Sequence, residues 1–228
     1  MLTLGLDSSE GYGELAAWEG DRLIGVATTK ESLRHAEELL PMMEHLLKTH
    51  DLDKAQIDLI SVNLGPGSFT GLRIGLATAK GLCQALEIPL VGVNGTFSYR
   101  SRLESERYVC VIIPDRRDLY YVQWYIDMEA AGAIEVVAER DLLKRIKGTH
   151  KEVTTVGSGA ERLRNLLESM QGVKLASKEM NRPSAASIAQ LGTNSYDTDR
   201  LYDLDPIYVE PAITGRSKLR GDSYGSGL

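Results

Sequence analysis

A glycine-rich stretch with two hydroxyl side chains is the part of this sequence best suited to bind a ligand. Residues 64–75 (LGPGSFTGLRIG) follow an apolar run at residues 57–62, which predicts a strand, a tight turn and a helix that begins near Gly71. The amides of such a turn can bind a phosphate or a carboxylate, and Ser68 or Thr70 can accept from the first helical amides. A capped connection needs the same residues without a ligand, so both interpretations stay open. No Gly-Lys-Ser/Thr follows, which excludes a Walker loop.

Metal-dependent and nucleophilic chemistry find little support in the residue types. His35, His45 and His50 are ten and five positions apart, so no two of them share the i, i+4 face that a helical metal site would use. Ser68 has no candidate base at a recognisable spacing, and its surroundings do not match the GxSxG elbow of hydrolases. We therefore predict no metal, no cofactor and no catalytic residue.

The composition indicates a globular protein with one large domain or two small ones. The 228 residues are 43% hydrophobic, which is enough to bury a substantial core. A formal net charge of -6 argues against an autonomous nucleic-acid binder, which needs a basic face. Cys83 and Cys110 suggest neither a disulfide framework nor a zinc site. Asp7 comes too early for a signal peptide, and no apolar run approaches membrane-spanning length, so we expect a cytoplasmic protein.

Hydrophobic periodicity places the glycine-rich stretch inside an α/β unit with the order βββαβαβ. The helix expected before the stretch has an apolar stripe wider than a minimal core-facing stripe needs. The expected elements are strands at residues 2–6, 12–18 and 22–28, a helix at 32–50, a strand at 57–62, a helix at 71–86 and a strand at 90–93.

A polar stretch at residues 99–107 separates this unit from a second strand system, and we place the domain boundary there. The predicted domains are residues 1–103 and residues 104–214, followed by a tail at 215–228 that we expect to be disordered. The second domain is expected to contain strands at residues 108–113, 119–126, 134–137 and 153–156 and helices at 140–146, 159–170 and 184–195.

Four segments of the chain resemble the TsaB family, also called YeaZ. They are Asp-Ser-Ser at residues 7–9, LGPGSFTGLR at 64–73, PLVGV at 89–93 and PDRRDLY at 114–120. The resemblance extends to about residue 209 and is strongest in the first half of the chain. It implies a two-domain α/β fold of the actin-like ATPase and sugar-kinase superfamily, a ribonuclease H-like fold with mixed sheets flanked by helices.

The resemblance also implies a role in the bacterial synthesis of threonylcarbamoyladenosine in tRNA. In this family TsaB is the noncatalytic partner of the TsaD-like transferase, a TsaE-like ATPase joins the assembly, TsaB contacts tRNA only indirectly, and homodimers form through the same surface. TsaD-like catalysts carry an HxxxH metal pair directly after the strand that matches residues 90–93, whereas residues 94–100 of this chain contain no histidine. The alternatives are a degenerate actin-like ATPase or a glycoprotease-like (peptidase M22-type) hydrolase. The basic residues of the tail keep direct tRNA binding open as a third alternative.

Residues that match the phosphate-binding positions of actin-like ATPases follow from the same resemblance. Such proteins place a carboxylate for the metal where Asp7 ends the first strand, but Glu10 follows closely and would repel a phosphate. The glycine turn at residues 157–159 could approach a nucleotide, or could only connect a strand to a helix. The phosphate-loop-like residues are Asp7, Ser8, Ser9, Gly65, Gly67, Ser68, Thr70, Gly71, Gly157 and Gly159.

The wide apolar stripe of the first helix predicts a helix-to-helix interface with another chain, because one sheet face cannot cover so wide a stripe. The family resemblance implies that the first two helices bind the transferase. Periodicity alone does not decide which of their residues face the core. The residues expected at this interface are Ala36, Leu39, Leu40, Met43, Leu47, Leu72, Arg73, Leu76 and Lys80.

Overall fold

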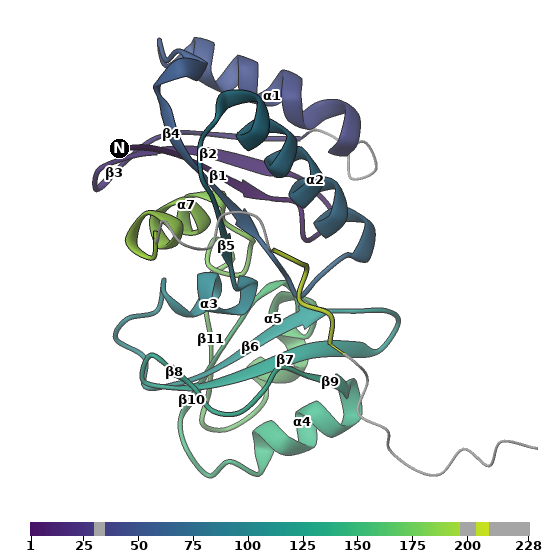
Figure 1. Ribbon diagram of the computed structural model, residues 1–228. Coiled ribbons are helices and arrows are strands. Elements are labelled where there is room, and N and C mark those ends of the chain that lie inside the picture. Colours follow the sequence, from purple (N-terminus) through teal and green to yellow (C-terminus); the bar gives the residue numbers. More distant parts are fainter. Residues whose placement is uncertain (30–34, 197–203, 210–228) are drawn as a thin grey trace, which may run out of the picture.

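The protein contains two sheets, each covered by helices, and the computed structural model describes residues 1–29, 35–196 and 204–209 (Figure 1). The first sheet has the strand order β3-β2-β1-β4-β5. Strands β1, β4 and β5 run parallel, while β1, β2 and β3 form an antiparallel meander. Its strands are β1 (Leu2–Asp7), β2 (Glu14–Glu19), β3 (Arg22–Thr28), β4 (Ile57–Asn63) and β5 (Leu90–Val93).

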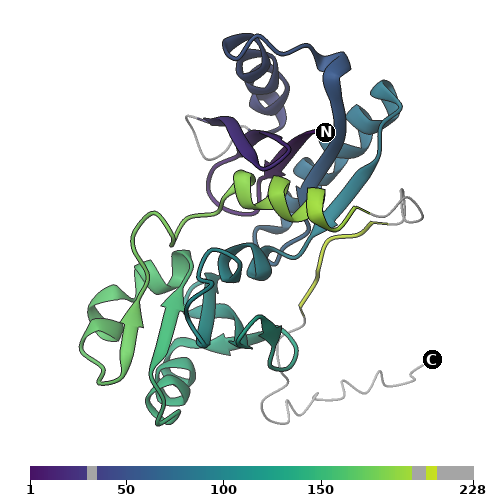
Figure 2. The ribbon, with the colours of Figure 1, turned by 90° about the vertical axis from the view of Figure 1, so that its left-hand side faces the viewer.

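Helices cover both faces of this first sheet. Helices α1 (His35–Thr49) and α2 (Phe69–Leu86) lie on one face, and the short helix η1 (Lys54–Gln56) precedes β4. Helix α7 (Ala185–Asn194) crosses the other face, as the two perpendicular views show (Figures 1 and 2). The hydroxyl of Ser61 in β4 donates to the carbonyl of Ile188 in α7 at 2.7 Å. The chain therefore returns to its first sheet after it has built the second.

The second sheet has the strand order β11-β10-β6-β7-β8, with β9 paired to β7. Strands β6 and β7 form its antiparallel centre, and β10 and β11 extend it in parallel. Its elements are β6 (Tyr108–Pro114), β7 (Leu119–Ile126), β8 (Glu129–Ala130), β9 (Glu135–Ala138), α4 (Glu139–Lys147), β10 (Val153–Val156), α5 (Ser158–Arg162), α6 (Arg164–Glu168) and β11 (Val173–Leu175).

The expected order of elements is confirmed over most of the described chain, with three local differences. The helix expected at residues 159–170 consists of α5 and α6, which meet at Leu163. Strands β8 and β11 were not expected, since each has only two or three residues. Helix α3 (Gly95–Arg100) occupies part of the expected polar linker, because the Asn94 side chain accepts from the amide of Thr96 at 2.9 Å and caps it.

The division of the chain at residues 103 and 104 stays a prediction. Helix α7 belongs in sequence to the range 104–214, yet it packs on β1, β2 and β4 of the first sheet. The tail at residues 215–228 and the start of the expected first helix at residues 32–34 lie outside the described residues.

A buried arginine closes the connection between the two sheets. Arg100 is 1% exposed, and its guanidinium donates to the carbonyls of Asp127, Leu103 and Glu106 at 2.6, 2.5 and 2.9 Å. A charge at this depth is tolerated because each of its three nitrogens donates to a backbone oxygen. Arg100 thereby joins the end of α3 to the loops that flank β6 and β7.

We predict that Arg100→Met lowers the free energy of unfolding by about 3 kcal/mol or more, because three carbonyl groups lose their donor. Urea unfolding checks this value. The control is Arg107→Met, whose side chain is 67% exposed and faces Asp127 at 3.8 Å, and we expect a change within about 0.5 kcal/mol there. Equal losses in the two variants would show that the carbonyl contacts do not determine the stability of this connection.

Candidate functional site

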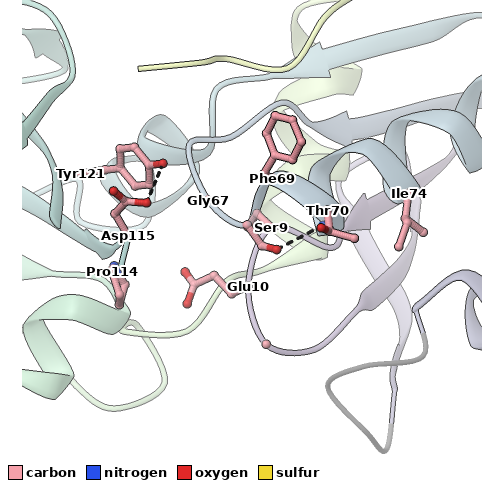
Figure 3. Close-up of a pocket in the computed structure, with 12 residues that line it drawn as sticks. Ser9, Glu10, Gly67, Phe69, Thr70, Ile74, Pro114, Asp115 and Tyr121 are labelled. Atoms are coloured by element: carbon pink, nitrogen blue, oxygen red, sulfur yellow. Dashed lines mark hydrogen bonds between the residues drawn. The ribbon is translucent and has the colours of Figure 1, made fainter. Parts of the chain in front are cut away.

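A cleft of about 660 Å³ lies between the two sheets at the glycine-rich turn (Figure 3). Three segments line it: the loop after β1, the turn that leads into α2, and the connection between β6 and β7. The lining residues are Ser9, Glu10, Gly11, Gly67, Ser68, Phe69, Thr70, Gly71, Ile74, Pro114, Asp115 and Tyr121.

The glycine-rich turn is packed directly against the loop after β1. The amide of Ser68 donates to the carbonyl of Ser9 at 2.6 Å, and a Cβ atom on Gly67 would lie 2.3 Å from that oxygen. The hydroxyl of Ser8 donates to the carbonyl of Gly71 at 2.9 Å, and the amide of Gly71 donates to the Ser68 hydroxyl at 3.2 Å. The amides of Ser68 and Gly71 therefore already donate hydrogen bonds within the protein, which supports the interpretation of the turn as a capped connection.

The carboxylate of Asp7 is buried and fully occupied by neighbouring donors. Asp7 is 1% exposed, and its Oδ1 accepts from the amide and the hydroxyl of Ser9 at 2.9 and 2.7 Å. Its Oδ2 accepts from Nδ2 of Asn63 at 2.9 Å, while Oδ1 of Asn63 accepts from the amide of Gly65 at 2.7 Å. Asn63 thus ties the metal-ligand candidate to the glycine-rich turn. Sequence reasoning missed it, although a polar residue at the end of an apolar strand was a visible signal.

Glu10 projects into the cleft from the loop after β1 (Figure 3). Burial raises its pKa to about 7, and the nearby carboxylate of Asp7 acts in the same direction. The hydroxyl of Tyr99 in α3 donates to Oε1 of Glu10 at 2.6 Å, a contact that sequence reasoning also missed. The other carboxylate at the cleft is Asp115, which accepts from the hydroxyl of Tyr121 at 3.1 Å. The charge of Asp115 would oppose a bound phosphate, and Glu10 would add to this repulsion only at pH values above about 7, where it loses its proton.

The second glycine turn connects β10 to α5 on the second sheet. Gly157 has a φ of +109°, and its amide donates to Oδ1 of Asn181 at 3.1 Å. Glycine is required here because a Cβ atom would lie 2.4 Å from the carbonyl of Ile112 in β6. Ser158 lines a smaller cavity of about 340 Å³ together with Glu10. The structure therefore brings residues 7–9 and 65–71 together, while Gly157 and Gly159 pack on the second sheet.

The residues expected at a partner interface fall into a buried and an exposed set. Leu40 is 46% exposed, Arg73 is exposed and Lys80 is half-buried. Helix α1 packs on β2, β3 and α2, so several of the expected interface side chains lie in the core of this chain, and the interface itself stays a prediction. The expected interface residues that are no more than 6% exposed are Leu39, Met43, Leu47, Leu72 and Leu76. The side chain of Ala36 is outside the described residues.

Residues 1–29, 35–196 and 204–209 contain neither a cluster of metal ligands nor a membrane-spanning helix. Within these ranges, no three histidine, cysteine, aspartate or glutamate side chains gather closely enough to hold a metal ion. None of the helices in these ranges is both long and apolar enough to cross a membrane.

Comparison with known proteins gives consistent family matches along the chain. The family model described as TsaD, tRNA N6-adenosine threonylcarbamoyltransferase, matches residues 21–197. The tRNA threonylcarbamoyladenosine biosynthesis protein TsaB of Escherichia coli K12 is 24% identical over 97% of this chain and 99% of that protein. The protein of the same name from Bacillus subtilis 168 is 26% identical over 93% of this chain and 95% of that protein.

Solved structures confirm the expected fold class. A Pseudomonas aeruginosa protein described as similar to the peptidase YeaZ has a TM-score of 0.71 and 23% identity, covering 92% of this chain and 99% of its own. Component A of the (R)-2-hydroxyglutaryl-CoA dehydratase of Acidaminococcus fermentans has a TM-score of 0.56 and 9% identity, covering 84% of this chain and 97% of its own. These neighbours confirm a mixed α/β fold with two sheets flanked by helices.

We predict that Gly67→Val lowers the free energy of unfolding by about 2 kcal/mol or more, because the new side chain collides with the carbonyl of Ser9. Chemical denaturation measures the change. Gly81→Val is the matched control, since a Cβ atom at Gly81 meets no atom within 4 Å. An unchanged stability of Gly67→Val would mean that the turn is a ligand or interface element rather than a part of the fold.

A pH prediction follows from the raised pKa of Glu10, which is about 7 in the folded protein. The folded state holds its proton at pH values where the unfolded state has lost it, so the free energy of unfolding falls as pH rises from about 4.5 to about 7. We expect Glu10→Gln to reduce this fall by about 1 kcal/mol or more, since one pKa unit is worth about 1.4 kcal/mol. Urea unfolding at several pH values measures it.

Part of the decrease in the free energy of unfolding with rising pH should remain in Glu10→Gln, because burial also raises the pKa of Glu14 to about 7. Glu19→Gln serves as the control, since Glu19 is exposed at the end of β2. A pH profile of Glu10→Gln that matches the wild-type profile would contradict the protonation of Glu10 in the folded cleft.

Proposed function

Because the chain belongs to the tRNA N6-adenosine threonylcarbamoyltransferase (TsaD) family and, within it, to the TsaB (YeaZ) proteins, we propose that it is a noncatalytic partner of a TsaD-type transferase. In this role it serves tRNA threonylcarbamoyladenosine biosynthesis in the cytoplasm. A TsaE-type ATPase joins the assembly, and the isolated chain forms a homodimer through the same helices. The chain contacts tRNA only through its partners.

The occupied carboxylate of Asp7 is the observation that carries the noncatalytic part of the proposal. An actin-like ATPase needs this group free to position a metal-bound phosphate, whereas here it accepts three hydrogen bonds, from Ser9 and Asn63. Glu10 adds a carboxyl group inside the cleft, and its Oε1 is bound to Tyr99. The hydroxyl of Ser68 accepts from the amide of Gly71 as the cap of α2, which gives it a structural role in place of that of a nucleophile.

The exposed faces of α1 and α2 support the partner part of the proposal. Leu40 and Pro41 are exposed on α1. On α2, Arg73, Ala77 and Gly81 are exposed at intervals of four residues, so they share one face of the helix. Because Ala77 and Gly81 are small, the backbone of a partner helix can approach this face closely. The buried residues beneath this face hold the two helices in place.

Reconstitution of the modification tests the proposal. The purified chain, tRNA and threonylcarbamoyl-adenylate should give no modified tRNA, and a TsaD-type transferase from the same source should give more product when the chain is added. Mass spectrometry of the digested tRNA measures the product. Modified tRNA formed by the chain alone, or a transferase whose rate does not respond to the chain, would contradict the proposed role.

We predict that Ala77→Arg weakens binding to the transferase at least tenfold, a loss of about 1.4 kcal/mol, because a long charged side chain prevents close helix packing. Ala77 is exposed, so the variant should keep the melting temperature of the wild type. Ala133→Arg, an exposed position outside α1 and α2, is the matched control. Met43 is unsuitable for this test, because it is 6% exposed and a charge there would disturb the core.

Isothermal titration of the transferase into each variant gives the dissociation constants. Wild-type affinity in folded Ala77→Arg would place the partner elsewhere on the surface. Equal weakening by Ala133→Arg would show that the effect of added charge is not specific to α2.

A further inference from the structure

Residues 204–209 form a segment, here called the C-terminal strap, that lies across the start of α2 (Figure 1). Leu204 packs against the core of the first sheet, and its carbonyl accepts from Nζ of Lys80 at 2.8 Å. The amide of Ile207 donates to the carbonyl of Leu64 at 2.7 Å, at the beginning of the glycine-rich turn. These contacts fix the strap beside the helix face to which we assign the partner.

The strap completes a cluster of one arginine and two aromatic rings, here called the aromatic–arginine patch: Phe69, Arg73 and Tyr208. The guanidinium carbon of Arg73 lies 3.6 Å from the ring centroid of Phe69, and its Nε donates to the hydroxyl of Tyr208 at 3.0 Å. The two ring centroids are 5.6 Å apart. Phe69 is 55% exposed and Tyr208 is 52% exposed, so both rings keep a large apolar surface in solvent.

The arrangement orients the guanidinium before any partner arrives. Stacking on Phe69 and the bond to Tyr208 hold the plane of the Arg73 guanidinium, and its two terminal nitrogens keep their donors. Among the residues that the structure describes, no carboxylate lies within ion-pair distance of Arg73. A planar guanidinium binds a carboxylate through two parallel hydrogen bonds. Arginine and tyrosine are also enriched among the residues that dominate binding energy at protein interfaces.

We propose that the aromatic–arginine patch extends the contact surface for the transferase partner to the start of α2, where it binds a carboxylate of the partner that is flanked by an apolar side chain. This inference rests on the proposed function and extends its interface, because Arg73 lies one helical turn from Ala77 on the same exposed face. The C-terminal strap is then part of the binding surface. Tyr208 brings the end of the described chain into contact with a helix that begins at Phe69.

Dissociation constants of patch variants for the purified transferase test this inference. Arg73→Ala and Tyr208→Ala should each weaken binding about tenfold or more, as loss of a dominant interface residue does. Arg73→Lys should also weaken binding, because an ammonium group lacks the planar pair of donors. Tyr208→Phe should weaken it less than Tyr208→Ala, since it keeps the ring and loses only the hydroxyl that orients Arg73. The controls are Tyr196→Ala and Arg140→Ala, both exposed outside the patch.

The outcomes separate this inference from the proposed function. Wild-type affinity in the patch variants, together with loss of binding in Ala77→Arg, would overturn the patch and leave the interface on α2 in place. Tighter binding by Tyr208→Ala would show that the strap competes with the partner, which also contradicts the inference. A wild-type chain that does not bind the transferase would overturn both. Unchanged melting temperatures of the variants confirm that lost affinity does not result from unfolding.

Discussion

The contact between the loop after β1 and the glycine-rich turn after β4 is the interaction on which the cleft and α2 depend. Asn63 joins the two segments, because one end of its amide binds Asp7 and the other accepts from Gly65. Ser8 then binds the first turn of α2 at Gly71. With the start of this helix fixed, one face of α2 fills the core and the opposite face is exposed.

The same contact gives the residues at the cleft a structural role. The fold of this chain places the carboxylate of Asp7 and the glycine-rich turn close together where the two sheets meet. Here the internal hydrogen bonds of Asp7 and Ser9 stabilise that junction, so the residues have a structural reason to be there. Burial raises the pKa of Glu10 to about 7, and its Oε1 accepts from the hydroxyl of Tyr99, which joins the loop after β1 to α3 between the sheets. The site thereby becomes a structural connection.

Local patterns in the sequence predict most of the fold, because strands and helices follow from periodicity and the glycine-rich turn from its composition. What the sequence did not reveal depends on contacts between distant residues. The pairing of Tyr99 with Glu10 and the return of α7 to the first sheet are of this kind. A helical wheel shows the width of an apolar stripe but not the direction of the sheet, so Leu39 and Leu40 could not be separated into core and surface before the packing was known.

Titration of the isolated chain with magnesium ATP, followed by calorimetry, tests the central claim that the protein's own groups occupy the cleft. The hydrogen bonds of Asp7 and the carboxyl group of Glu10 predict no saturable binding at concentrations up to about 1 mM, where the binding free energy would be about -4 kcal/mol. Saturable micromolar binding that disappears in Asp7→Ala would contradict the account and identify the chain as a nucleotide-dependent protein.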